Sequence, residues 1–128
     1  MGKILMIDDD PAFLRLIDEY IEETYPNLEV ITCNDPIRCL TRITTDLDLL
    51  LVDLEMPGLD GSKILAYATS IGLNKNKVII VSGRDSDYLH EKFPMGSCLA
   101  VLNKNEGKQK RVLDMVFKSL QQKSVAKG

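Results

Sequence analysis

The chain has 128 residues, of which 45% are hydrophobic and 27% charged, a composition typical of one ordinary globular domain. A chain of this length can bury enough surface to hold its core without disulfides or a structural metal. Its 16 Lys and Arg against 19 Asp and Glu give a net charge of -3. The basic footprint of a nucleic-acid-binding domain is therefore missing, and we expect no direct nucleic-acid binding.

The cysteines and the amino-terminal residues indicate the cellular compartment of the protein. Cys33, Cys39 and Cys98 form an odd set with no CxxC pair and no nearby histidine at ligand spacing. This pattern argues against a disulfide framework and a zinc site, and it predicts three small core residues. The first residues lack the apolar stretch of a signal peptide, and no run approaches about 18 apolar residues. We therefore expect no membrane insertion and a cytoplasmic protein.

Short apolar runs alternate with helical patterns along the whole chain, as in repeated strand-helix units with a parallel sheet. Most runs are continuous Ile, Leu and Val, as in strands that are covered on both faces. The predicted strands comprise residues 3–7, 29–33, 49–53, 78–82 and 99–102. Helical spacing and stop signals predict helices around residues 13–24, 35–44, 61–70, 85–93 and 112–120.

These elements predict an α/β fold, a doubly wound five-stranded parallel sheet of the flavodoxin-like order 2-1-3-4-5 with helices on both faces. We expect one domain over residues 1–121, followed by a polar tail at residues 122–128. In such sheets, ligands bind beyond the carboxyl ends of the strands at the switch point between strands one and three. The residues that end those two strands are therefore the first candidates for a site.

Carboxylates follow both of these strands. Strand one ends in Asp8-Asp9-Asp10, and strand three ends in Asp53, so the predicted order brings them to one edge of the sheet. Two unit charges about 4 Å apart repel by roughly 4 kcal/mol at an effective dielectric of about 20, which favours a bound cation. Oxygen ligands without His or Cys suit Mg²⁺.

Two of the nearby aspartates have a structural explanation. Asp is a preferred N-cap and Pro a preferred first helical residue, so Asp10 before Pro11 is assigned to capping the first helix. Asp60 can cap the third helix in the same way. Because one cap needs only one Asp, Asp8 and Asp9 remain as metal candidates.

Asp53 ends an apolar strand, where a carboxylate is costly unless it is paired or used. A positioned carboxylate beside Mg²⁺ can attack phosphorus and form an aspartyl phosphate. Two later strand ends carry Ser82, a hydroxyl donor, and Lys104, an ammonium group, and both suit phosphoryl transfer. Taken alone, each also fits an ordinary turn residue or a solvated surface charge. The combination is what points to phosphoryl chemistry.

The set Asp8, Asp9, Asp53, Ser82 and Lys104 resembles the receiver domain of two-component response regulators, and the resemblance covers nearly the whole chain. KILMIDDDP is similar to the opening of the family, and CNDPIRCL to the usual start of its second helix. DLLLVDLEMPGLDG resembles the phosphorylation-site segment, and its DLEMPGLDG part is highly specific.

The resemblance implies a signalling module and not a turnover enzyme. It would accept a phosphoryl group on Asp53 from a phosphohistidine of a sensor histidine kinase or a phosphotransfer protein. Mg²⁺ would be held by Asp8, Asp9 and Asp53, and Lys104 would pair with the phosphoryl group. Ser82 would move toward the phosphoryl oxygens and shift the balance between two conformations.

The family often pairs through its fourth helix, fifth strand and fifth helix, so the resemblance also offers a homodimer through these elements. Here they correspond to the predicted helix at residues 85–93, the strand at residues 99–102 and the last helix. The kinase, the signal and any output domain are not identified by the sequence.

Four positions depart from the family pattern or tune it. Asn105 follows Lys104 where the family commonly has Pro, so a cis peptide is not expected there. Val101 stands where the switch aromatic usually lies and has no ring to swing inward behind Ser82. Glu55 and Arg84 occupy positions that tune phosphate lifetime in the family. They either pair across the pocket mouth or are two solvated loop charges.

Two other functions stay open at this point. The chain could be a receiver-like interaction module that works without phosphorylation, because Val101 and Asn105 depart from the usual switch. The complete acid set argues against this alternative. A hydrolase with an Asp nucleophile would need an acid/base Asp where Glu55 stands, and 128 residues leave no room for a cap domain.

Overall fold

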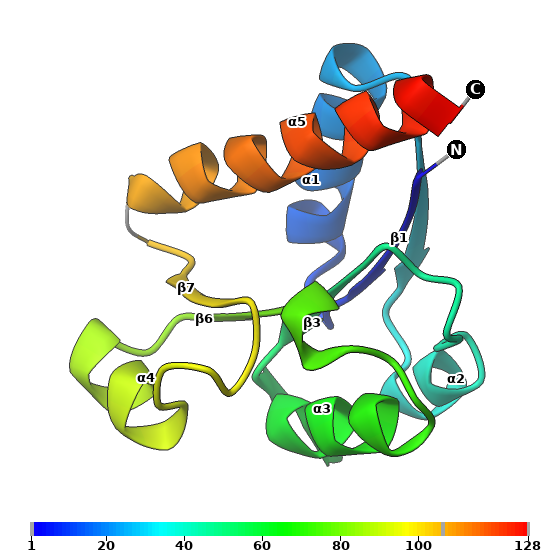
Figure 1. The fold of residues 1–128 in the computed structure, drawn as a ribbon. Coiled ribbons are helices and arrows are strands. Elements are labelled where there is room, and N and C mark those ends of the chain that lie inside the picture. The colour runs from blue at the N-terminus through cyan, green and yellow to red at the C-terminus, as the bar shows by residue number, and fades with distance from the viewer. Residues whose placement is uncertain (1, 106, 128) are drawn as a thin grey trace.

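The computed structural model describes residues 2–105 and 107–127, which form a parallel sheet between two layers of helices (Figure 1). The hydrogen-bonded order of the strands is β2-β1-β3-β6-β7, and every neighbouring pair is parallel. This is the predicted order 2-1-3-4-5. The strands of this sheet are β1 (Gly2–Ile7), β2 (Leu28–Cys33), β3 (Leu49–Asp53), β6 (Val78–Ser82) and β7 (Ala100–Asn103).

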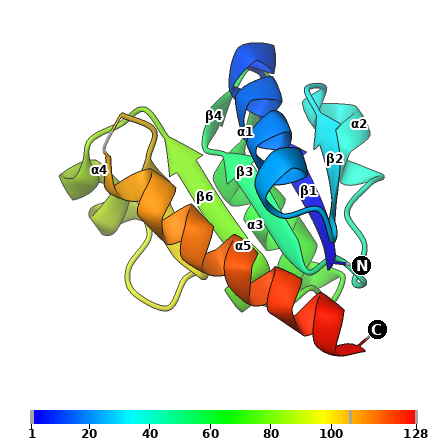
Figure 2. The same cartoon turned by 90° about the horizontal axis from the view of Figure 1, so that it is seen from above.

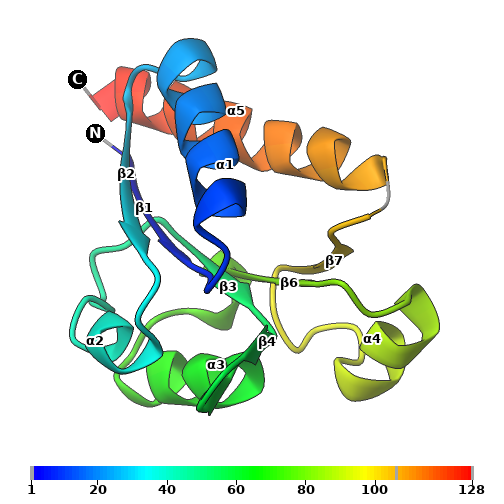
Figure 3. The same cartoon turned by 180° about the vertical axis from the view of Figure 1, so that it is seen from behind.

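The helices divide between the two faces of the sheet. α1 and α5 lie together on one face, and α2, α3 and α4 lie on the other, as Figure 1 and the opposite view in Figure 3 show. Seen from above, α5 runs obliquely across the sheet beside α1 (Figure 2). Their bounds are α1 (Pro11–Thr24), α2 (Pro36–Leu40), α3 (Gly61–Ser70), α4 (Ser86–Lys92) and α5 (Lys108–Lys127), with a 3₁₀ turn η1 (Lys75–Lys77) before β6.

Each helix layer covers its own apolar cluster. Leu14 and Ile21 of α1 and Phe117 of α5 pack with one set of strand residues, and Ile64 of α3 and Leu89 of α4 pack with the other. All five residues of β3 and of β6 are buried, which matches their continuous apolar sequences. Burial on both faces explains why these strands carry no alternating polar pattern.

Aspartates begin four of the helices. The side chain of Asp10 accepts hydrogen bonds from backbone N–H groups at the start of α1, and Asp60 does the same for α3. Asp35 caps α2 and Asp85 caps α4. These oxygens satisfy N–H groups that have no partner within the helix. The capping roles predicted for Asp10 and Asp60 are confirmed.

The clearest differences from the predicted elements are at α2, at residues 55–60 and at the end of α5. α2 ends at Leu40 rather than residue 44, because the following N–H groups bond three residues back and β-branched residues follow. Residues 55–60, for which no strand was predicted, form a hairpin of two-residue strands, β4 (Glu55–Met56) and β5 (Leu59–Asp60). α5 continues to Lys127 because Gln, Lys and Ala favour helix and no Pro or Gly interrupts it. The domain boundary at residue 121 stays a prediction.

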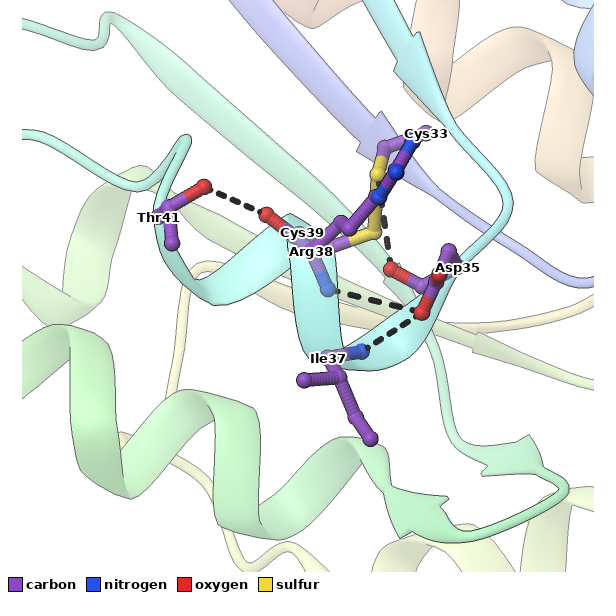
Figure 4. The surroundings of a disulfide bond; sticks show 6 residues. All are labelled: Cys33, Asp35, Ile37, Arg38, Cys39 and Thr41. Carbon is purple, nitrogen blue, oxygen red and sulfur yellow. Dashed lines mark hydrogen bonds between the residues drawn. A yellow bond between two sulfur atoms is a disulfide. The ribbon is translucent and has the colours of Figure 1, made fainter.

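The prediction of three unpaired cysteines is wrong for two of them. Cys33 at the end of β2 and Cys39 on α2 form a disulfide with a Cα–Cα distance of 5.8 Å (Figure 4). Cys98 is a free, buried core residue, as expected. The turn after β2 folds the chain back, so residues six apart in sequence meet. Because these two cysteines do not form a CxxC pair, the sequence pattern did not predict their disulfide.

A membrane span is not found in the part of the chain that the structure describes. Among its helices, none combines the length and the apolar composition that crossing a bilayer requires.

Candidate functional site

The first carboxylates of the site follow β1 at the carboxyl edge of the sheet. Asp8 is only 1% exposed, whereas Asp9 is exposed. The backbone N–H of Asp8 donates to the carbonyl oxygen of Cys33 at 3.2 Å, which ties the start of the loop to the end of β2. Asp8 Oδ1 accepts the N–H of Asp10 at 2.9 Å. The carboxyl group of Asp8 is therefore held by a hydrogen bond within its own loop.

Asp53 ends the neighbouring strand β3 and is 4% exposed. Its Oδ1 accepts the backbone N–H of Glu55 at 3.4 Å. The next residue, Leu54, is held on both sides, because its N–H donates to Val81 and its carbonyl accepts the N–H of Gly61. This bracing fixes the direction in which the Asp53 side chain leaves the strand.

A glycine makes this bracing possible. A Cβ on Gly61 would lie 2.5 Å from the carbonyl oxygen of Asp53 and 2.8 Å from Leu54 Cα. Only a residue without a side chain lets the start of α3 approach the end of β3 so closely. Gly61 therefore positions Asp53, although sequence analysis assigned it only to the start of a helix.

Lys104 follows β7 and reaches back across the sheet edge to both buried carboxylates. Its Nζ lies 2.7 Å from Asp8 Oδ2 and 3.6 Å from Asp53 Oδ2. The stem is guided by Phe13, whose ring centroid is 4.6 Å from the ammonium, a cation–π contact that the sequence did not reveal. Burial favours the neutral amine, but the nearby negative charges of Asp8 and Asp53 outweigh it and raise the pKa of Lys104.

The pKa of Asp53 is raised to about 7. The largest cause is burial of the carboxyl group, and the negative charge of Asp8 adds to it, whereas Lys104 opposes both. One ammonium thus fails to balance the three carboxylates that meet here. The site favours an additional positive charge.

The donor set fits a hard divalent cation. Asp8, Asp9 and Asp53 each offer one carboxylate oxygen, and these oxygens lie within 4.8 Å of one another. Asp8 Oδ2 is buried, and no hydrogen bond of good geometry reaches it from the described residues, although Lys104 lies at ion-pair distance. A group of carboxylate oxygens without His or Cys suits Mg²⁺.

Ser82 lies at the end of β6 and is fully buried. Its hydroxyl donates to Glu55 Oε1 at 2.6 Å and accepts the N–H of Arg84 at 3.0 Å. The second oxygen of Glu55 lies 3.9 Å from Arg84 Nη1, and the guanidinium of Arg84 stacks over the ring of Tyr88 at 4.1 Å. The sequence left two interpretations open for Glu55 and Arg84. In the structure, the two side chains form an ion pair. The bond from Ser82 to Glu55 was not foreseen.

The structure also places the two residues that depart from the family pattern. Val101 lies in β7 opposite Ile80 and packs against the core rather than at the site. The peptide bond between Lys104 and Asn105 is trans, as expected. Asn105 donates its N–H to Asn103 Oδ1 at 2.7 Å, which closes the turn after Lys104.

The sequence profile of the response regulator receiver domain family matches residues 4–123. The chain belongs to this family. Receiver domains are the phosphoacceptor signalling modules of two-component systems, where they interact with histidine kinases or phosphotransfer proteins, and they are not enzymes in the ordinary sense. The acidic pocket at the carboxyl edge of the sheet accords with that role.

Relatives of this receiver domain come from plants and bacteria. It is 27% identical over 88 residues to the two-component response regulator ARR11 of Arabidopsis thaliana, covering 66% of this chain and 16% of that protein. It is 43% identical over 63 residues to the glycerol metabolism activator of Pseudomonas putida, covering 48% and 28%. The transcriptional regulatory protein CpxR of Escherichia coli is 32% identical over 90 residues, covering 68% and 36%. The receiver domain thus spans a minor part of each of these relatives.

Solved structures share the fold over 91% to 100% of this chain. A response regulator receiver domain protein of Clostridium thermocellum has a TM-score of 0.72 and 23% identity, with 100% of both chains covered. The response regulator protein TrrA of Thermotoga maritima, in complex with Mg²⁺-BeF, has a TM-score of 0.71 and 23% identity, covering 91% and 99%. A Francisella receiver domain has a TM-score of 0.74 and 24% identity, covering 93% and 98%.

Proposed function

We propose that this receiver domain takes a phosphoryl group onto Asp53 from a phosphohistidine of a sensor histidine kinase or a phosphotransfer protein. The observation that carries the proposal is the convergence of Asp8, Asp53 and Lys104 within ion-pair distance at one edge of the sheet. A carboxylate of Asp53 attacks phosphorus, the new P–O bond forms as the P–N bond breaks, and the imidazole leaves with the electron pair.

The chain's own groups prepare this step. Asp8, Asp9 and Asp53 would hold Mg²⁺, which when bound neutralises charge on the phosphoryl oxygens. Lys104 supplies a second positive charge beside Asp53, where it would pair with the phosphoryl group. Loop contacts at Asp8 and the close approach of Gly61 behind Asp53 keep both carboxylates in place before the donor arrives.

We further propose that Ser82 carries the conformational response. Its hydroxyl donates to Glu55 in this structure, and a phosphoryl group on Asp53 would offer it a more highly charged acceptor. Transfer of this hydrogen bond would release Glu55 and Arg84 and draw in the loop after β6. Pairing of two copies through α4, β7 and α5 stays a prediction.

The direct test is phosphorylation by a small acyl phosphate in the presence of Mg²⁺. We expect a mass gain of one phosphoryl group that is lost in base, and no gain in Asp53→Asn. Asp60→Asn is the matched control, because this carboxyl group lies near the same loop but caps α3, a role that Asn also fills. Absence of the adduct in the unmodified chain would overturn the proposal. Partner binding that ignored both Mg²⁺ and phosphate would favour an interaction module instead.

A further inference from the structure

The disulfide lies next to the acidic pocket and is connected to it through the backbone. Cys33 is opposite Ile7 in the β1–β2 ladder, and its carbonyl oxygen accepts the N–H of Asp8 at 3.2 Å. The residue that carries one sulfur of the bridge is therefore hydrogen-bonded to a candidate metal ligand. A change at Cys33 reaches Asp8 through a single contact.

The segment that the bridge fastens is otherwise weakly held. α2 has five residues, too few to form a stable helix without tertiary contacts. β2 is an edge strand, paired only with β1. The Asp35 cap, the burial of Cys39 and the packing of Leu40 against the core also hold α2. The covalent bond thus joins a short helix to the edge of the sheet beside the site.

One of the two bridged cysteines lies at the surface. Cys33 is partly exposed, whereas Cys39 is fully buried. Cys33 lines a surface hollow of about 400 Å³ together with Asp35, Arg38 and Arg42. Figure 4 shows the Arg38 side chain extending toward the Cys33 end of the bridge. The hollow has room for a small thiol, and the positive charges of its two arginines attract an anionic one.

We propose that Cys33 and Cys39 form a reversible thiol–disulfide site whose redox state sets the Mg²⁺ affinity and the phosphorylation rate of the neighbouring pocket. The inference about the pocket rests on the function proposed above. The bridged form holds the Asp8 loop in the geometry described here, and the dithiol form releases α2 and loosens that loop. The bridge thus acts as a second input to the receiver domain.

Both directions of the reaction balance with ordinary cellular reagents. In reduction, a thiolate attacks Cys33 Sγ, the bond to Cys39 breaks and Cys39 leaves as a thiolate that takes up a proton. A second thiol then displaces Cys33 and forms a disulfide with the first. In oxidation, the Cys33 thiolate attacks a hydroperoxide and becomes a sulfenic acid as an alcohol leaves. Cys39 displaces hydroxide from it, which is released as water.

The first measurement counts thiols by alkylation and mass after exposure to a dithiol or a hydroperoxide. We expect one alkylated cysteine per denatured chain in the oxidised form, Cys98, and three in the reduced form, with full recovery of the bridge on re-oxidation. Failure of the bridge to re-form would overturn the proposal.

The second measurement compares the redox forms at the pocket. We expect reduction to weaken Mg²⁺ binding at least threefold, followed through the amide signals of Asp8 and Asp9 in NMR spectra, and to slow phosphorylation by an acyl phosphate at least as much. Cys33→Ser should match the reduced form and ignore oxidant. The matched control is Cys98→Ser, which removes the free buried thiol and should keep the full redox response.

The outcomes separate the two proposals. Equal Mg²⁺ affinity and equal phosphorylation rate in the two redox forms would overturn the redox inference, even if Asp53 accepts phosphate in both. If neither form is phosphorylated, the proposed function fails, and the Mg²⁺ affinities alone then decide the redox inference.

Discussion

The acidic pocket and the cysteine bridge lie at the same end of the sheet but are held in different ways. Asp8 follows β1 and Asp53 ends β3, and both strands have a neighbour on each side. Cys33 ends the edge strand β2, and Cys39 lies on a helix of only five residues. Hydrogen bonds, packing and the Lys104 ion pairs act on the pocket directly, whereas the edge segment is also held by a covalent bond. The hydrogen bond from Asp8 to Cys33 joins the pocket to an edge segment that reduction of the disulfide would loosen.

The largest effect is expected from removing the positive charge of the pocket. Lys104→Met keeps the apolar stem but leaves Asp8 and Asp53 without their ammonium partner. Phosphorylation by an acyl phosphate should slow by about 100-fold, because a preorganised charge at the reacting group is lost. The rate of adduct formation, followed by mass spectrometry, measures this.

Lys92→Met is the matched control for Lys104. Lys92 pairs with Asp60 in an exposed salt bridge of 3.2 Å, and such pairs contribute about 0 to 1 kcal/mol to stability. Its phosphorylation rate should stay within about twofold of the unmodified chain. Equal rates in both lysine variants would contradict the role of Lys104.

Gly61→Ala tests how tightly packing holds the pocket. The added Cβ would meet the backbone of Asp53 at 2.5 Å, and rigid backbone cannot move aside as a flexible side chain can. We expect a loss of about 3 kcal/mol in the free energy of unfolding, measured with denaturant. Gly83→Ala has open space at the same atom and should change stability by less than about 0.5 kcal/mol. A fully stable Gly61→Ala would show that α3 can retreat from β3.

Reduction of the disulfide tests how strongly it stabilises the edge of the sheet, again through the free energy of unfolding. Opening a short cross-link frees the unfolded chain, so a dithiol should lower the free energy of unfolding by about 2 kcal/mol. Thermal unfolding with and without the dithiol measures the change. Cys98→Ser should lose the same amount on reduction, whereas Cys33→Ser should not respond. A reduced chain as stable as the oxidised one would mean that the bridge constrains little.

The pH dependence of stability reports on Asp53. Its pKa is about 7 in the folded chain and about 3.9 when unfolded, so the folded state holds the proton more tightly. Stability from this group is therefore fully present below pH about 4 and is lost as pH rises through about 7. Without Mg²⁺, the free energy of unfolding should fall by about 1 to 2 kcal/mol between pH 5.5 and pH 7.5.

Asp53→Asn provides the reference for the pH measurement. The difference in the free energy of unfolding between the unmodified chain and this variant should depend on pH. Saturating Mg²⁺ should remove this pH dependence, because the cation stabilises the carboxylate. A difference that rises with pH would have the wrong sign for a raised pKa.

The smallest effect concerns access to the bridge. Arg38→Gln removes one positive charge from the hollow beside Cys33, so reduction by an anionic thiol such as glutathione should slow by about two- to fourfold. Reduction by a neutral thiol should change less. Thiol counting over time measures both rates, and equal slowing of the two would point to altered packing instead of charge.

Much of the site could be predicted because it rests on local rules. Asp53 after a continuous apolar strand and Ser82 after another are visible in the sequence, and parallel topology places such residues at one edge. The caps at Asp10 and Asp60 were also predictable, since an N-cap is a contact within four residues. The sheet order followed from the alternation of strands and helices.

Other features depend on distances that only folding sets. The hydrogen bond from Ser82 to Glu55 joins residues 27 apart, and the contact of Phe13 with Lys104 joins the start of α1 to the end of β7. The Cys33–Cys39 bridge depends on how sharply the chain turns after β2. No periodicity in the sequence encodes these approaches.

The sequence by itself determined the strand order, the capped helices and the acids and hydroxyl that end the strands, because repeated apolar runs and short-range hydrogen bonds leave a direct trace in residue order. Tertiary structure decided that one ammonium lies at ion-pair distance from two buried carboxylates, that Glu55 accepts the hydrogen bond of Ser82, and that a disulfide fastens the edge beside Asp8. The physical reason is that charge, packing and covalent reach depend on distance in space, which the order of residues does not contain.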